Sequence, residues 1–266
     1  MKIVRTIAEL EQARPPGEIG LVPTMGAYHD GHLALFKAAR AENDSVVASL
    51  FVNPAQFAAG DDFERYPRDQ ERDARIAEEA GVDVLFAPAA EELYPPGFQT
   101  WVEVDELSRP LEGAFRPGHF RGVATVCLKL FNLVRPTRAY FGQKDAQQAA
   151  VVRRMVRDLN APLEIRVVDT VRDADGLALS SRNAYLSPGE RERALALPRA
   201  LATRDAEQAR QLLDGVEVDY VEEADLDGMR VLAAAIRVGS TRLIDNILLE
   251  GDNGWLPATP PRNRRS

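Results

Sequence analysis

Short apolar runs alternate with helix-like stretches through the first two thirds of the chain. The runs are apolar on both faces, as expected of strands buried in a parallel sheet, and they cover Ile19–Pro23, Val46–Val52, Val82–Phe86, Ala139–Phe141 and Leu163–Val168. Helical periodicity appears between them, over His32–Glu42, Tyr66–Ala80, Phe120–Val134 and Asp145–Leu159. The alternation predicts an α/β fold, a doubly wound parallel sheet covered by helices, whose ligands bind beyond the carboxyl ends of the strands.

The pattern changes near Thr170. Ser187 and Pro188 are typical of a helix start, and an Ala/Leu/Arg-rich stretch predicts one long helix that ends at about Leu213. Three strands are expected after it, at Val216–Ala224, Met229–Val238 and Thr241–Leu249. We therefore predict a main domain over 1–170, a smaller C-terminal α+β domain over 171–253, and a disordered Pro/Arg-rich tail over 254–266.

Composition fits a globular protein that builds its core without disulfides. The chain has 266 residues, of which 45% are hydrophobic and 28% charged, with a formal net charge of −8. A negative balance disfavours nucleic acid and anionic membranes as partners. The single cysteine, Cys127, lies inside an apolar run and is expected in the core, which excludes a disulfide framework and a Cys-rich zinc site.

The first ten residues carry Lys2, Arg5 and Glu9 and do not resemble a signal peptide. The sequence contains no uncharged apolar stretch of about 18 residues or more, the length that a membrane-spanning helix needs. We expect a cytoplasmic protein.

Two of only three histidines fall in one turn, His29-Asp30-Gly31-His32, between the first predicted strand and its helix. Gly31 lets the backbone approach a phosphate closely, and a helix N-terminus supplies free N–H groups for it. The imidazoles can donate hydrogen bonds to phosphate oxygens as charge builds in a transition state. The pattern favours a nucleotide site; the alternative is a pair of surface histidines.

Three further polar segments also follow predicted strands. Each has an ordinary structural explanation as a helix cap, an interdomain turn or an Asn-Pro turn. The segment Phe141–Gln148 offers the Lys144 ammonium group and the Gln148 amide. The next offers the hydroxyls of Ser180 and Ser181 with the Arg182 guanidinium. The third offers the neutral amides of Asn53 and Gln56. If all of them converge on one sheet edge, they ring a single polyphosphate-binding site.

The motifs taken together resemble the pantothenate synthetase (pantoate–β-alanine ligase) family. They occur in the family's order from about residue 1 to 250, as Pro23-Thr24-Met25-Gly26 with His29-x-Gly-His32, Phe-Val-Asn-Pro-x-Gln-Phe at 51–57, Tyr-Pro-Arg at 66–68, His-Phe-x-Gly-Val at 119–123, Phe-Gly-x-Lys-Asp-x-Gln-Gln at 141–148, Ser-Ser-Arg-Asn at 180–183 and Thr-Arg-Leu-Ile-Asp-Asn at 241–246.

The resemblance implies a Rossmann-like main domain, a small C-terminal lid and a homodimer. It implies that pantoate and ATP give pantoyl adenylate and pyrophosphate, and that β-alanine then displaces AMP to give pantothenate. Mg²⁺ is expected to accompany ATP, with no metal ligands assigned to the chain.

The resemblance also assigns site residues. His32, His29, Lys144 and Arg182 are the expected catalytic groups. The expected ATP contacts are Met25, Gly26, Ala27, Tyr28, His29, Asp30, Gly31, His32, Gly142, Gln143, Lys144, Asp145, Val171, Leu179, Ser180, Ser181 and Arg182. The expected substrate contacts are Gln56 and Gln148, joined by Asn53, Tyr66 and Arg116.

Four positions depart from the usual pattern of the family. Gln143 stands where Glu is common, Ala146 where an aromatic residue is common, and Leu179 and Ala55 where Met is common. The segment between Asn183 and Asp245 is also short. We expect altered affinity or lid motion from these departures and unaltered chemistry.

Three other functions compete with the ligase. A nucleotidyltransferase of the same HIGH superfamily shares the His-x-Gly-His turn but is expected to lack the Asn-Pro-x-Gln and Gly-x-Lys-Asp-x-Gln-Gln motifs. A class I tRNA synthetase is disfavoured by the short, acidic chain. A nucleotide sensor would bind ATP and catalyse nothing.

Overall fold

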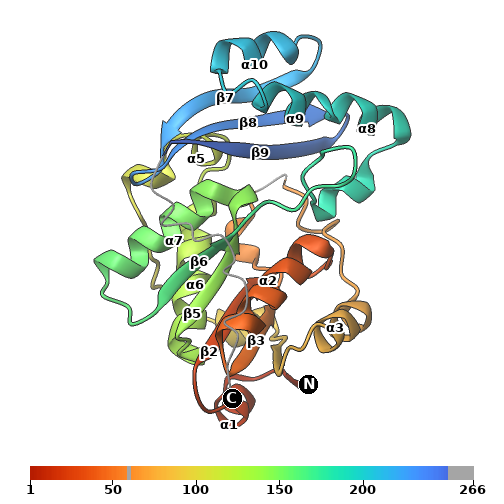
Figure 1. The fold of residues 1–266 in the computed structure, drawn as a ribbon. Coiled ribbons are helices and arrows are strands. Elements are labelled where there is room, and N and C mark those ends of the chain that lie inside the picture. The colour runs from red at the N-terminus through yellow and green to blue at the C-terminus, as the bar shows by residue number, and fades with distance from the viewer. Residues whose placement is uncertain (59–60, 251–266) are drawn as a thin grey trace, which may run out of the picture.

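A six-stranded, fully parallel sheet forms the centre of the computed structural model, which describes residues 1–58 and 61–250 (Figure 1). The strand order is β1-β4-β3-β2-β5-β6. The strands are β1 (Lys2–Val4), β2 (Ile19–Thr24), β3 (Ser45–Leu50), β4 (Val84–Phe86), β5 (Arg138–Gly142) and β6 (Glu164–Val168). The chain proceeds outward from β2 in one direction and from β5 in the other, so the crevice beyond these two strands is the place where such sheets bind ligands.

Helices cover both faces of this sheet, because successive strand residues point to opposite sides. Leu21 of β2 packs with α1 and α6, whereas its neighbour Val22 packs with Phe36 of α2 on the other face. The helices and turns are α1 (Ile7–Ala13), α2 (Asp30–Glu42), η1 (Pro54–Gln56), α3 (Gln70–Glu79), α4 (Ala90–Leu93), η2 (Glu106–Ser108), α5 (Glu112–Phe115), α6 (His119–Val134), η3 (Gln143–Asp145) and α7 (Ala146–Asp158). The predicted doubly wound α/β architecture is confirmed.

A smaller antiparallel sheet, ordered β7-β8-β9, follows and lies across one end of the parallel sheet (Figure 1). Its elements are η4 (Ser181–Tyr185), α8 (Pro188–Ala194), α9 (Ala196–Leu201), α10 (Ala206–Leu212), β7 (Glu217–Asp225), β8 (Arg230–Val238) and β9 (Thr241–Glu250). Leu232 and Ile236 pack with the helices, whereas Ala233 and Ala235 join the main core. The predicted C-terminal α+β unit and its three strands are confirmed.

The single long helix predicted to end near Leu213 is wrong, because the stretch forms three helices. Pro198 lacks the N–H that would continue α8 past Leu195. Arg204 then adopts a left-handed conformation (φ 59°), and Asp205 caps α10 by accepting from the N–H of Gln208 at 2.8 Å. The edge strand β1 was not predicted, because three residues are too few for a period to be visible.

The division at residue 170 stays a prediction, and the predicted tail 254–266 lies outside the described residues. No helix in the described part of the chain combines the length and apolarity needed to cross a membrane.

The buried carboxylate of Glu112 joins α5 of the main unit to the C-terminal sheet. It accepts two hydrogen bonds from Arg242 of β9, both at 2.7 Å, and one from the Tyr220 hydroxyl of β7 at 3.0 Å. Arg242 also donates to Asp219 at 2.6 Å. A carboxylate removed from water is stabilised only by such complete pairing.

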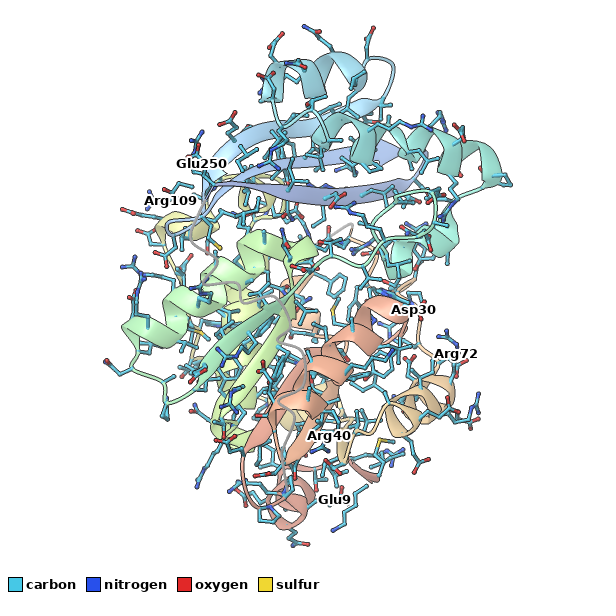
Figure 2. All side chains as sticks on the ribbon, viewed as in Figure 1. Glu9, Asp30, Arg40, Arg72, Arg109 and Glu250 are labelled. Carbon is cyan, nitrogen blue, oxygen red and sulfur yellow. The ribbon has the colours of Figure 1, made fainter. Side chains whose placement is uncertain are left out.

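Glu112→Ala should therefore destabilise the protein by about 3–5 kcal/mol, because it leaves the Tyr220 hydroxyl without its partner and the Arg242 guanidinium with Asp219 alone. The free energy of unfolding in urea measures this. The control is Asp105→Ala, which removes the partner of the exposed Arg109 seen on the surface in Figure 2. That control should leave the denaturation midpoint unchanged, and equal losses in both variants would contradict the role of Glu112.

Candidate active site

The loop between β2 and α2 has a fixed backbone shape. Gly26 and Ala27 both adopt positive φ, at 91° and 54°. The buried carboxylate of Asp73 in α3 accepts hydrogen bonds from the N–H groups of Ala27 at 2.7 Å and Tyr28 at 2.9 Å. A side chain at Gly26 would lie 2.6 Å from Leu50 and 2.8 Å from Asp73. These contacts therefore fix the backbone conformation of the loop that leads into α2.

The two imidazoles at this helix start have defined tautomers. His29 Nδ1 accepts from the Gly31 N–H at 3.1 Å, and His32 Nδ1 accepts from the His29 N–H at 3.3 Å. The proton of each neutral ring is consequently on Nε2. Burial lowers the pKa of His29 to about 4 and of His32 to about 3, and the positive charge of Lys144 adds to both shifts. Both rings are neutral hydrogen-bond donors at neutral pH.

Lys144 lies at the carboxyl end of β5, in the turn η3. Its ammonium group is 3.5 Å from the Asp145 carboxylate, and its side chain is 19% exposed. Asn246 of β9 donates from Nδ2 to the carbonyl oxygens of both Gln143 and Lys144, each at 2.9 Å. The C-terminal sheet thus fixes the turn that carries the lysine.

The segment after β3 is pressed against the start of α6. Asn53 Nδ2 donates to Gln56 Oε1 and to the Gly122 carbonyl, both at 3.1 Å. His119 Nδ1 donates to the Gln56 carbonyl at 2.9 Å. A Cβ on Gly122 would approach the Ala55 carbonyl oxygen to 2.2 Å, so glycine is required for this close contact. The two amides are therefore held rigidly.

Arg182 donates two hydrogen bonds of 2.8 Å to the carboxylate of Asp62. Burial acts to raise the pKa of Asp62, but the hydrogen bonds and charge of Arg182 outweigh it, and the pKa is lowered. The hydroxyls of Ser181 and Tyr66 lie 3.4 Å apart, and Tyr185 donates to the Arg65 carbonyl at 2.9 Å. The 180–185 segment is thus joined to the segment after η1.

One cavity of about 230 Å³ receives most of the predicted site residues from these four segments. The ones that line it are Met25, His29, Gly31, His32, Asn53, Gln56, Tyr66, Arg116, Gly142, Lys144, Asp145, Gln148, Val171, Leu179, Ser180, Ser181 and Arg182. The carboxyl ends of β2 and β5 flank it, as the switch point of the sheet requires.

Five predicted ATP contacts do not line this cavity. They are Gly26, Ala27, Tyr28, Asp30 and Gln143. Tyr28 is 1% exposed, with its ring packed in the core against Phe36. Asp30 opens α2 at the end nearest the C-terminal sheet (Figure 2). The Tyr28 side chain is therefore structural.

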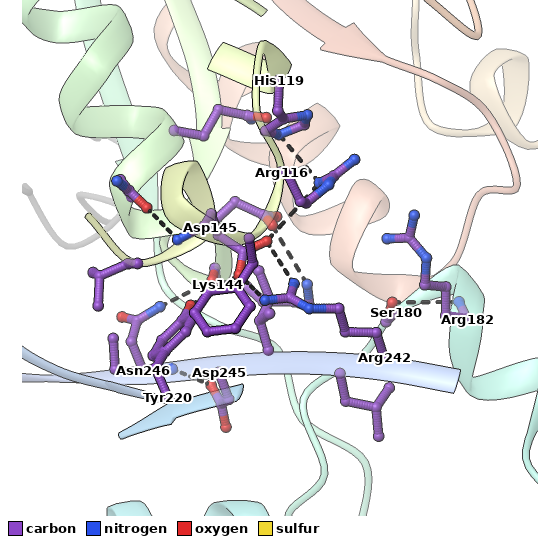
Figure 3. Close-up of a pocket in the computed structure, with 18 of the residues that line it drawn as sticks. Arg116, His119, Lys144, Asp145, Ser180, Arg182, Tyr220, Arg242, Asp245 and Asn246 are labelled. Atoms are coloured by element: carbon purple, nitrogen blue, oxygen red, sulfur yellow. Dashed lines mark hydrogen bonds and ion pairs between the residues drawn. The ribbon is translucent and has the colours of Figure 1, made fainter. Parts of the chain in front are cut away.

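A second, larger cavity of about 380 Å³ adjoins the first (Figure 3). Arg116, His119, Lys144, Asp145, Gln148, Ser180 and Arg182 line both cavities. Its remaining wall comes from α5, α6, α7, η4, the C-terminal sheet and the segment with Asp61, Asp62 and Arg65, so the site extends between the two sheets.

Sequence reasoning missed Asp73, Asp62 and His119. Asp73 and Asp62 lie in strongly charged stretches, where nothing distinguishes a buried carboxylate from solvated ones. His119 had a usable signal, because it is one of only three histidines and precedes an apolar helix.

Comparisons with known proteins agree with this geometry. The family model described as Pantoate-beta-alanine ligase matches residues 2–248. Pantothenate synthetases of Heliobacterium modesticaldum and Moorella thermoacetica are each 52% identical, over 94% of this chain and 100% and 99% of their own lengths.

Two solved structures are similar over nearly the whole chain. Pantothenate synthetase from Thermus thermophilus has a TM-score of 0.90 at 49% identity, with 94% of this chain and 99% of that chain covered. Pantoate-beta-alanine ligase from Francisella tularensis, complexed with Beta-gamma ATP and Beta-alanine, has a TM-score of 0.84 at 35% identity, with coverages of 95% and 99%. By sequence and by fold, this chain belongs to the pantoate-beta-alanine ligase family.

Proposed function

We propose that this chain condenses pantoate with β-alanine at the expense of ATP, releasing AMP and pyrophosphate, through a pantoyl adenylate. The observation that carries the proposal is the single cavity where Nε2–H donors of His29 and His32, the Lys144 ammonium group and the amides of Gln56 and Gln148 meet. The Francisella tularensis relative, solved with an ATP species and β-alanine, supports the same substrates.

The ATP phosphates bind at the N-terminus of α2 in this proposal. The two imidazoles at the helix start and Lys144 converge there, and the partial positive charge of the helix N-terminus favours an anion. Arg182 adds a planar pair of donors once the phosphates replace the Asp62 carboxylate as its partner. The other proposed ATP contacts are Met25, Gly26, Ala27, Tyr28, Asp30, Gly31, Gly142, Gln143, Asp145, Val171, Leu179, Ser180 and Ser181.

We treat Mg²⁺ as part of the ATP substrate. Within residues 1–58 and 61–250, no group of three or more His, Cys, Asp or Glu side chains is placed to hold a metal ion. Magnesium keeps several waters and commonly binds through substrate phosphates.

Pantoate occupies the end of the cavity beside η1 and α6. Its hydroxyl and carboxylate groups fit the neutral amides of Gln56 and Gln148, and Asn53, Tyr66 and Arg116 line the same cavity. Its methyl groups fit the apolar wall made by Phe51, Val123, Val126 and Leu130.

Two displacements then follow. A carboxylate oxygen of pantoate attacks the α-phosphorus, the bond to the bridging oxygen breaks, and pyrophosphate leaves with that electron pair. Positioning and stabilisation of charge supply most of the catalysis in such a step, and the neutral imidazoles act as pre-aimed donors. The neutral amine of β-alanine next attacks the acyl carbon, AMP leaves, and the nitrogen loses a proton to water.

Pyrophosphate–ATP exchange tests this function directly. Exchange of label should require pantoate but not β-alanine, and AMP should accumulate only when β-alanine is added. Exchange without pantoate, or AMP release without β-alanine, would contradict the proposal.

His32→Ala should lower pantoate-dependent exchange by roughly a hundredfold or more, because it removes a fixed donor to the developing charge. The matched control is Lys37→Ala, an exposed position on the same helix. Initial exchange rates at saturating substrates measure the effect. Near-normal exchange in the folded His32→Ala variant would show that the assigned role is wrong.

The three histidines should remain neutral across the physiological range in the ligand-free protein. Burial is the leading cause that lowers the pKa of His29 and His119 to about 4 and of His32 to about 3, below the usual 6.5. In the unfolded chain the imidazoles bind protons from pH 6.5 downward, whereas in the folded chain they stay neutral to lower pH. The three histidines therefore lower the free energy of unfolding as pH falls from 6.5 toward 4. Proton NMR of the ring signals should show no midpoint above pH 5.5, and one near 6.5 would contradict this.

We propose further that the enzyme acts as a homodimer in the cytoplasm, as expected from the sequence. Light scattering should give twice the chain mass of 29.3 kDa, and a cell lysate should hold the protein in its soluble fraction. A mass of one chain, or sedimentation with membranes, would overturn this.

A further inference from the structure

The larger cavity meets the smaller one where, in the proposed function, the pantoate carboxylate lies next to the ATP phosphates. Lys144, proposed to hold phosphate, and Gln148, proposed to hold pantoate, line the cavities on both sides of that boundary. Arg116 and His119, which lie beside each other in Figure 3, also line both cavities. If pantoyl adenylate occupies the smaller cavity, as the proposed function requires, an amine that attacks the acyl carbon can approach from the larger one.

Part of the wall of the larger cavity is apolar. Leu111, Phe120, Ala146, Leu226 and Ala233 form this part, beside charged lining residues such as Glu112 and Arg242. Ala146, the first residue of α7, presents only a methyl group to this space. At about 380 Å³, the cavity is within the range of pockets that hold drug-sized ligands, well beyond the needs of β-alanine.

The Arg116 guanidinium is held less closely by carboxylates than those of Arg182 and Arg242, which line the same cavity. Its nearest carboxylate oxygens are 3.5 Å away on Asp61 and 3.9 Å away on Glu112. Arg242 and Arg182, in contrast, are paired at 2.6–2.8 Å. Arg116 is therefore available for the carboxylate of the incoming amino acid, with methylene groups of that molecule turned toward the apolar part of the wall.

We propose that this chain also transfers the pantoyl group to ω-amino acids longer than β-alanine, 4-aminobutanoate first, and that the small side chain of Ala146 permits this. The inference rests on the proposed function. The amine lone pair forms the C–N bond, the acyl C–O bond to phosphate breaks with its electrons on AMP, and the nitrogen releases one proton to water.

The test measures kcat/KM for AMP release with ATP, pantoate and each of β-alanine, 4-aminobutanoate and 5-aminopentanoate. For the unaltered chain, kcat/KM for 4-aminobutanoate should be within about tenfold of the value for β-alanine. One extra methylene group in an apolar pocket changes kcat/KM only modestly. Discrimination of more than a hundredfold against it would overturn the proposal while the ligase function stands. Absence of β-alanine-dependent AMP release would instead sink the proposed function itself.

Ala146→Phe should fill the cavity and lower the 4-aminobutanoate to β-alanine ratio by about tenfold or more. Ala146→Leu tests the same point with a smaller side chain and should give a smaller decrease. Leu159→Phe, at the 53% exposed end of α7, is the matched control and should leave the ratio unchanged. A ratio unchanged in both Ala146 variants, or equal losses for both amines, would exclude the role of Ala146.

Discussion

The amide of Asn246 holds the geometry on which the site depends. By donating to the carbonyl oxygens of Gln143 and Lys144, it ties β9 to the turn after β5. Glu112 with Arg242 ties α5 to the C-terminal sheet, and Arg172 with Asp245, at 2.6 Å, ties the segment after β6 to the same sheet. Because these contacts join the C-terminal sheet to the lysine turn, any shift of that sheet moves Lys144 relative to the imidazoles of α2.

The histidine turn shows how backbone contacts define chemistry. Each Nδ1 is used to accept a main-chain N–H, which leaves Nε2–H as the only outward donor. Burial keeps both rings neutral, so the positive charge in the cavity comes from Lys144 and from guanidinium groups. Donors that carry no charge of their own stabilise a developing oxyanion without holding the ground-state phosphates equally tightly.

Much of this arrangement was predictable from sequence. Short apolar runs in the sequence identified β2 to β6 and the three C-terminal strands, because buried strands consist of continuous apolar residues. Polar segments at strand ends could be assigned to one rim, because parallel strands share a carboxyl edge. The burial of the Tyr28 side chain could not be predicted, since a loop motif does not show which of its members turn inward. Asp73 and Asp62 escaped notice because their partners are distant in the chain, and Pro198 was not weighed as a helix breaker.

The transfer of one oxygen atom tests the acyl adenylate, the central claim of this account, most directly. Pantoate labelled with ¹⁸O in its carboxylate is incubated with the enzyme, ATP and β-alanine, and the AMP is analysed by mass spectrometry. One labelled oxygen should appear in the phosphate of AMP, because the attacking carboxylate oxygen stays on phosphorus when the amine displaces AMP. Unlabelled AMP formed in step with pantothenate would contradict the account.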